Sequence, residues 1–197
     1  VLVTRLRNDW VASDALLAQS QALWQALGAH GKALARLRNR GQCWLRLGRV
    51  AEAQACFEHC EQQAAADGNV VEQIDSQLSL STLLAGQRQW AAALQVDRRC
   101  LQLCWQHWHR HGLGYALWNP PLALARLRRP EAALQLMAFA QAYWEGSVGA
   151  LSTADRRSAA RVRRLAAVQV GHARADRLWA QGLALTLRDA VALALQA

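Results

Sequence analysis

Small and apolar positions recur along this chain every 40 residues, with the spacing of one helix face. Small residues occupy the first recurring position, and an apolar residue follows four places later in three of four copies: Ser13, Ala53, Ala93 and Ala133, then Leu17, Phe57, Asp97 and Met137. Steps of three and four continue the pattern through Ser20, Cys60, Cys100 and Ala140 to Trp24, Ala64, Cys104 and Trp144. Such steps follow one side of an α-helix. The pattern predicts one amphipathic helix per repeat, closely approached by a neighbour at its small residues.

A second helix precedes each of these and ends in a tight turn. The segments 36–47, 74–84 and 117–127 run into turns that contain Gly48, Gly86 and Pro130. We expect both glycines to take the left-handed conformation that closes a helix, and Pro130 to occupy a first helical turn. One helical hairpin cannot bury its apolar face alone, so neighbouring hairpins should stack into a solenoid.

The composition supports an all-α fold. Only 3 prolines and 12 glycines occur among 197 residues, while good helix formers dominate. Within residues 30–69, the best copy, the spacing of seven residues resembles the tetratricopeptide repeat: Leu37, Gly41, Trp44, Gly48, Ala53, Phe57 and Cys60. That resemblance implies a right-handed α-solenoid of helical hairpins with small residues at the crossings. We divide it into units 1–29, 30–69, 70–111 and 112–148.

The unit is longer than the standard tetratricopeptide repeat of about 34 residues, so HEAT-like repeats of about 40–47 residues are the structural alternative. Asp97 stands where an apolar residue is usual and indicates either a degenerate repeat or a solvated edge. Within 117–127, Pro120 and Pro121 should remove backbone donors and kink the helix.

After Gly149 the repeat pattern stops, and residues 149–197 are predicted to form capping helices. Ser152 and Asp155 have the spacing of a capping box, which predicts a helix from there to about Val170. A short helix at 173–181 should end at Gly182, and Thr186 should cap a last helix at 187–196. Such a terminal element usually covers the open end of a solenoid.

The run from Arg177 to Leu195, together with the turn at 129–134, resembles the C-terminal end of large bacterial regulators. These join a winged-helix or catalytic front end, a nucleotide-binding signalling ATPase and a tetratricopeptide-like region. The resemblance implies a cytoplasmic sensor and interaction segment that acts on the ATPase domain of its own parent chain. Pro120 and Pro121 depart from the family pattern, which usually has small non-proline residues there.

Charge and cysteine content change this picture little. The net charge of +9 comes almost entirely from arginine, since Lys32 is the single lysine, and we expect no direct nucleic-acid binding. The sequence contains no run of 18 apolar residues, so no membrane partner is predicted. The five cysteines lie inside helical patterns and fit reduced thiols better than a disulfide framework.

Three clusters of side chains could have a functional role, but each also has a purely structural explanation. Cys56 with Cys60, and Cys100 with Cys104, could hold half of a metal site or act in redox sensing, but they occupy small-residue core positions. His107 and His111 lack an acidic neighbour and suit a helix C-terminus. A basic face is formed by Arg157, Arg161 and Arg164, which fits phosphate, an acidic neighbouring domain or, more simply, solvent.

The function predicted is binding without catalysis, since no nucleotide-binding loop or nucleophile motif occurs and no cofactor or metal is expected. In tetratricopeptide-like stacks the first helix of each hairpin lines a groove for a protein, a peptide or a small effector. The groove candidates are Arg38, Gln42, Arg46, Asp75, Leu78, Thr82, Tyr115, Trp118 and Leu122. The alternative is a homo-oligomeric scaffold that associates through exposed aromatic pairs, either Trp105 with Trp108 or Tyr143 with Trp144.

Overall fold

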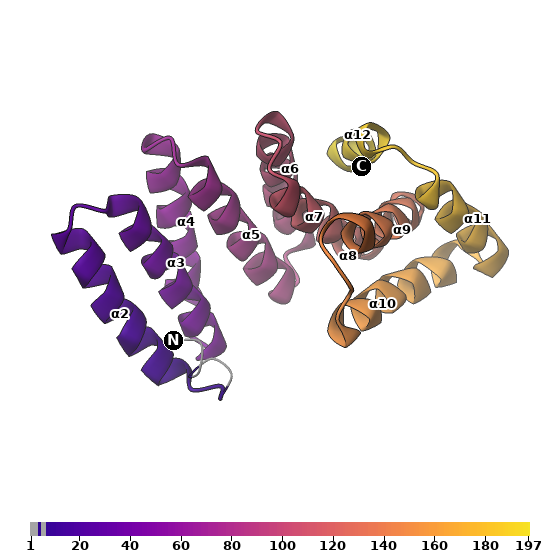
Figure 1. The fold of residues 1–197 in the computed structure, drawn as a ribbon. Coiled ribbons are helices and arrows are strands. Elements are labelled where there is room, and N and C mark those ends of the chain that lie inside the picture. Colours follow the sequence, from indigo (N-terminus) through magenta and orange to yellow (C-terminus); the bar gives the residue numbers. More distant parts are fainter. Residues whose placement is uncertain (1–3, 5–6) are drawn as a thin grey trace. The chain divides into compact units, whose positions relative to one another are not determined.

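A computed structural model describes residue 4 and residues 7–197 of the chain, and every regular element in that part is a helix (Figure 1). Consecutive helices pack against each other, as α2 does on α3 and α3 on α4, so the predicted all-α fold of helical hairpins is confirmed. The helices are α2 (Trp10–Ala26), α3 (His30–Arg46), α4 (Val50–Ala66), α5 (Val70–Gly86), α6 (Trp90–Gln106), α7 (Arg110–Trp118), α8 (Pro120–Arg126), α9 (Pro130–Ser147), α10 (Thr153–Val170), α11 (His172–Leu183) and α12 (Leu187–Gln196).

The chain forms two compact units, residues 1–83 and residues 84–197, and each is described by itself. The first contains α2, α3, α4 and most of α5, and the second contains the remaining helices. The predicted start of the capping segment, near Gly149, lies inside the second unit.

One type of turn ends successive helices at intervals of 20 residues. Helices α2 to α6 are each 17 residues long. The second residue of the three-residue turn has a φ between 50° and 79°, at Gly28, Gly48, Gly68, Arg88, Trp108 and Arg128. The amide of the following residue donates a hydrogen bond of 2.8–2.9 Å to a carbonyl five residues earlier, as Arg49 does to Trp44. This is the Schellman arrangement, and the 40-residue repeat is therefore two equal steps of helix and turn.

The turn after α5 corrects one prediction. Gly86 is the last residue of α5 and has no positive φ, whereas Arg88 takes the left-handed conformation with a φ of 62°. The position in the turn decides the conformation, since Arg88 stands where Gly28, Gly48 and Gly68 stand in the other turns. The left-handed residue is therefore Arg88, although Gly86 lies only two positions earlier.

In the first unit the predicted small positions are closely packed. Ser13, Ala53 and Phe57 have no exposed surface. A Cβ atom added at Gly41 would lie 2.7 Å from the Phe57 ring and 3.0 Å from Cys56 Sγ, so α3 can approach α4 this closely only at a glycine. A neighbouring core cluster contains Leu34, Cys56, Cys60 and Ala64, with Leu37 and Trp44 packed against it.

In the second unit the helical hairpin at 110–147 is interrupted as the prolines predicted. Helix α7 ends at Trp118 and α8 begins at Pro120, with Asn119 between them. Asp97, for which a solvated edge was one of two readings, is only 1% exposed. That reading is therefore wrong, because the carboxylate lies in the interior with the small positions Ala93 and Ala133.

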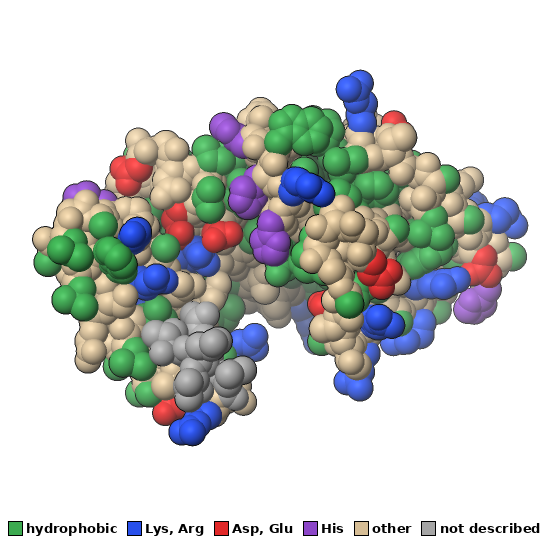
Figure 2. Space-filling model, viewed as in Figure 1, with side chains coloured by type: hydrophobic (Ala, Val, Ile, Leu, Met, Phe, Trp, Pro, Cys, Tyr) green, Lys and Arg blue, Asp and Glu red, His purple; other side chains and the backbone are tan. Residues whose placement is uncertain are grey.

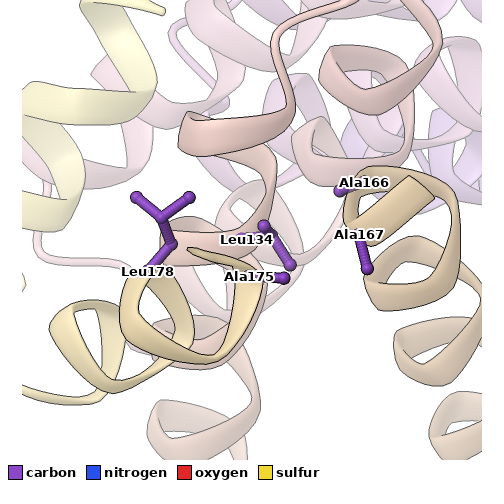
Figure 3. Close-up of a cluster of buried hydrophobic side chains, with 5 residues drawn as sticks. All are labelled: Leu134, Ala166, Ala167, Ala175 and Leu178. Atoms are coloured by element: carbon purple, nitrogen blue, oxygen red, sulfur yellow. The ribbon is translucent and has the colours of Figure 1, made fainter. Parts of the chain in front are cut away.

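The C-terminal helices begin as predicted. Ser152 and Asp155 form a capping box on α10, Thr186 and Asp189 form another on α12, and Gly171 separates α10 from α11 with a φ of 84°. Helices α10 and α11 pack on α9 through a small apolar cluster, whereas α12 packs on α6, α7 and α9. Figure 3 shows the cluster, formed by Leu134, Ala166, Ala167, Ala175 and Leu178.

Gly182 does not end its helix, contrary to the prediction. It lies within α11, which continues to Leu183. A Cβ atom at Gly182 would lie 2.3 Å from the Gln135 backbone oxygen and 2.7 Å from its Cα. The glycine therefore allows α11 to cross α9 at backbone contact. None of the helices described in the structure is long and apolar enough to cross a membrane.

Two glycine substitutions test the turn assignment. Gly48→Ala should lower the free energy of unfolding by about 1 kcal/mol, because an L residue pays that much in the left-handed conformation. Gly86→Ala should raise it by about 0.5–1 kcal/mol, because Gly86 is helical and has no atom within 4 Å of an added Cβ. Urea denaturation of both variants measures the difference. Shifts of the same sign would contradict the assignment.

Candidate functional site

In the first unit, the groove candidates form a polar layer between α3 and α5. Arg38 Nε donates a hydrogen bond of 2.6 Å to Glu72 Oε1, and its Nη2 donates one of 3.0 Å to Asp75 Oδ2. The Arg38 and Glu72 side chains are only 11% and 6% exposed. Arg38 and Asp75 are therefore bound to each other's helix rather than held free for a ligand.

Glu72 is a residue that the sequence analysis missed. Burial raises the pKa of its carboxyl group, and the charge and hydrogen bonds of Arg38 offset part of that effect. The signal was available, since Glu72 lies three residues before Asp75 and so on the same helix face. The guanidinium makes this buried carboxylate tolerable, so the pair works chiefly as a structural clamp between α3 and α5.

The remaining candidates of the first unit also contact protein groups. Gln42 Nε2 lies 3.4 Å from Ser79 Oγ, and the Arg46 guanidinium lies 5.7 Å from the centre of the Trp10 ring. Thr82 is exposed and donates a 2.8 Å hydrogen bond to the carbonyl oxygen of Leu78, one turn earlier on its own helix. Gln42 and Arg46 therefore connect α3 to neighbouring helices, whereas the Thr82 hydrogen bond stays within α5.

The cysteines are buried beside other packed groups. Cys56 Sγ lies 3.3 Å from the carbonyl oxygen of Leu37. The thiol hydrogen bond between Cys56 and Cys60, followed by burial, raises the pKa of Cys60, which keeps that thiol protonated. In the second unit, Cys100 Sγ and Cys104 Sγ lie 4.0 Å apart. Within the described chain, no three side chains of the types that bind metals come together.

The second unit contains an aromatic notch, which we define by Tyr115, Trp118, Trp144, Leu151 and Asp155. Its cavity has a volume of about 60 Å³. The Tyr115 and Trp144 ring centres lie 4.7 Å apart with the planes at 78°, and those of Trp118 and Trp144 lie 6.1 Å apart at 57°. Helix α7 provides two rings, α9 one, and the start of α10 the carboxylate.

Local structure places these groups. Gly114 gives Trp144 room against α7, because a Cβ atom there would lie 3.2 Å from the indole ring. The break at Asn119 makes Trp118 the last residue of α7. Asp155 is held by its capping box: its Oδ2 accepts hydrogen bonds from Ser152 N at 3.3 Å and Ser152 Oγ at 2.5 Å. Among the described residues, its Oδ1 has no hydrogen-bond partner.

The notch unites predicted and unpredicted residues. Tyr115 and Trp118 were groove candidates, whereas Trp144 was considered as a repeat position and for self-association, and Asp155 as part of a helix cap. Leu122, the third candidate of this unit, is half-buried on α8 and does not line the cavity. Sequence spacing could not find the set, because its members come from three separate helices and from the loop before α10.

The basic face of α10 is exposed at all three predicted positions, Arg157, Arg161 and Arg164. Figure 2 shows basic side chains over this helix. Arg164 also lines a cleft of about 330 Å³ between α10 and α11, together with His172 and Asp176. Its neighbour Arg163 pairs with Asp176 at 2.8 Å, which places a carboxylate inside that cleft and weakens it as an anion site.

The histidine and tryptophan residues near the end of α6 take separate roles. His109 Nδ1 accepts a 3.0 Å hydrogen bond from Gly112 N and so caps α7. His111 lies against the notch, with its ring centre 5.1 Å from that of Tyr115. Trp108 is 64% exposed, with its ring centre 4.8 Å from that of Trp105.

Comparison with known proteins adds no assignment: no protein-family model, no curated protein and no solved structure matches this chain.

Removing Arg38 tests the clamp. Arg38→Met should cost about 3 kcal/mol of stability near pH 7, because it leaves the buried Glu72 carboxylate without its partner. The pKa of Glu72 in the folded state should then rise further above its ordinary value. At pH values between the unfolded-state and folded-state pKa, Glu72 is protonated in the folded chain and ionised in the unfolded chain. The loss should therefore shrink as the pH falls toward about 5.

Denaturation of the Arg38→Met variant and of the unmutated chain across this pH range measures the effect. Arg49→Met is the matched control, because Arg49 pairs with Glu52 in solvent and its removal should leave the stability almost unchanged. A loss that stays constant with pH would show that Glu72 is not the group left unpaired.

Proposed function

We propose that this chain is a non-catalytic helical-repeat module that binds a small effector or a protein partner, as the sensor end of a larger bacterial transcriptional regulator. The observation that carries the binding role is the aromatic notch. Three aromatic side chains surround a cavity of about 60 Å³ at the protein surface, and Tyr115 remains 39% exposed.

Packing alone does not account for the notch. Elsewhere in this unit the large apolar side chains Leu113, Leu117, Leu124 and Met137 are fully buried. An unfilled space beside such rings forfeits dispersion contacts, which is a cost that a ligand group would recover. Ligand sites are concave and mostly apolar, with a few polar groups that fix orientation. The notch has this composition, and its size suits one group of a ligand.

The position of the notch supports a sensor role. A bound group would touch α7, α9 and the first turn of α10 together, and so would favour the arrangement in which α10 is docked. Helix α10 carries the exposed basic face of Arg157, Arg161 and Arg164, which suits an acidic surface on the parent's ATPase domain. Ligand binding could then shift the parent between two states through this one helix.

The link to a regulator rests on the resemblance of residues 177–195 to the C-terminal end of such proteins. In this structure that segment includes α12, which packs on α6, α7 and α9. Two of these helices provide the rings of the notch. The segment with the family resemblance is thus in contact with the helices that would bind the effector.

A thermal-shift screen of metabolites and peptides tests the binding role. At least one compound should raise the midpoint temperature of unfolding of the unmutated chain, since a ligand that binds only the folded state stabilises it by mass action. Trp118→Ala should abolish the shift, whereas Trp105→Ala, which removes a tryptophan outside the notch, should preserve it. Equal loss in both variants would indicate general destabilisation and contradict the assignment to the notch.

Self-association is the second candidate function, and a separate observation favours it. Trp108 is 64% exposed, and in the first unit Leu23 on α2 and Leu27 in the turn that follows α2 are 67% and 73% exposed. Large apolar side chains grouped on one helix face usually mark an interface. A scaffold would use these surfaces and would not need the notch.

Light scattering over a wide concentration series separates the two functions. A scaffold requires a mass above that of one chain that falls on dilution, and Leu23→Gln with Leu27→Gln or Trp108→Ser should then reduce it. We expect a single-chain mass at all concentrations, because a few exposed apolar side chains are common on monomeric proteins. A concentration-dependent mass abolished by these variants would favour the scaffold.

A further inference from the structure

The walls of the notch face in different directions. The Tyr115 plane is inclined by 78° and the Trp118 plane by 57° to that of Trp144, so the three rings enclose a corner rather than a stack. Parallel stacking would cover two ring faces per pair, whereas the edge-to-face contact of Tyr115 with Trp144 covers only one, and all three rings line the cavity. Aromatic faces carry partial negative charge and attract cations.

A carboxylate completes the corner. Asp155 lines the cavity, and its Oδ1 has no hydrogen-bond partner among the described residues, while its Oδ2 is held by Ser152. The capping box thus fixes the position of a negative charge whose other oxygen stays available. No arginine or lysine side chain lines the notch itself, although Arg156 Nε donates a 3.4 Å hydrogen bond to the carbonyl oxygen of Leu151 at its border. The only charged group in the lining is the Asp155 carboxylate, which favours a cation as the ligand.

The size of the notch and the side chains that line it favour a quaternary ammonium group over a primary one. One water needs about 10–15 Å³ of such a cavity, so about 60 Å³ fits a group of roughly five heavy atoms. A tetramethylammonium head has that size. A primary ammonium would bring three N–H donors, of which the Asp155 carboxylate can accept one while the rings accept the others poorly, and burying unpaired donors is costly. A fully methylated nitrogen has no such donor and keeps its charge.

We propose that the aromatic notch binds the quaternary ammonium head of a small organic cation, with Tyr115, Trp118 and Trp144 around the methyl groups and Asp155 as the counter-charge. This rests on the proposed binding function and names its ligand class. The rest of the ligand lies outside the notch, where Tyr115 is exposed.

Calorimetric titration of the whole 197-residue chain with choline tests the proposal. Two analogues serve as probes: 3,3-dimethylbutan-1-ol, which has the same shape without charge, and ethanolamine, which carries a primary ammonium. Choline should bind at least about tenfold more tightly than either, as expected for a desolvated cation–π site. Equal binding of choline and the neutral alcohol, or no heat with choline up to roughly 10 mM, would overturn the proposal.

Matched variants separate the charge from the helix cap. Asp155→Asn and Asp189→Asn each alter the same position of a capping box, on α10 and α12, but only Asp155 lines the notch. Asp155→Asn should weaken choline binding by about fivefold, and Asp189→Asn should not change it. Equal effects would assign the loss to helix stability and refute the role of the Asp155 charge.

Trp118→Leu should weaken choline binding by about fivefold or more, whereas Trp105→Leu should not change it. If choline fails while another compound of the thermal-shift screen still requires Trp118, the ligand class is wrong and the binding function stands. If no compound binds and the chain self-associates, the binding function itself is wrong.

Discussion

The hydrogen bond that closes each turn is the constraint on which the rest of the structure depends. A helix leaves its last carbonyl groups without partners, and here the amide after the left-handed residue bonds back to one of them at 2.8–2.9 Å. The same closure recurs every 20 residues whether the left-handed residue is Gly48, Arg88 or Trp108. Helices of equal length result from α2 to α6, so small residues recur at a fixed place in alternate helices. Close crossings such as Gly41 on Phe57 depend on that register.

The partly exposed side chains differ between the two units: they pair with one another in the first and leave a cavity in the second. In the first, long flexible side chains span neighbouring helices, so Arg38 satisfies Glu72 and Asp75, and the surface closes on itself. In the second, rigid rings meet at a helix break and cannot fill the angle between them, so a cavity remains beside Asp155. The first unit therefore neutralises its charges internally, whereas the second leaves an aromatic corner open, and the proposed binding role rests on that corner.

Features that depend on a few neighbouring residues were predictable. The capping boxes at Ser152 and Thr186, the break before Pro120 and the small positions Ala53, Ala93 and Ala133 all follow from local backbone chemistry or helix periodicity. The glycines were less predictable, because a glycine allows either a left-handed turn or a close approach. Gly48 does the first, Gly182 does the second against Gln135, and Gly86 does neither.

The helices, their spacing, the two capping boxes and the break in the hairpin at 110–147 could be derived from the residues alone, because these features arise from interactions within about five residues. Which polar and aromatic side chains meet depends instead on how the helices pack. Glu72 reaches Arg38 across 34 positions of the chain, and Trp144 and Asp155 join Tyr115 and Trp118 from other helices. Such meetings depend on how helices cross, and crossing geometry is set by packing at residues distant from the site.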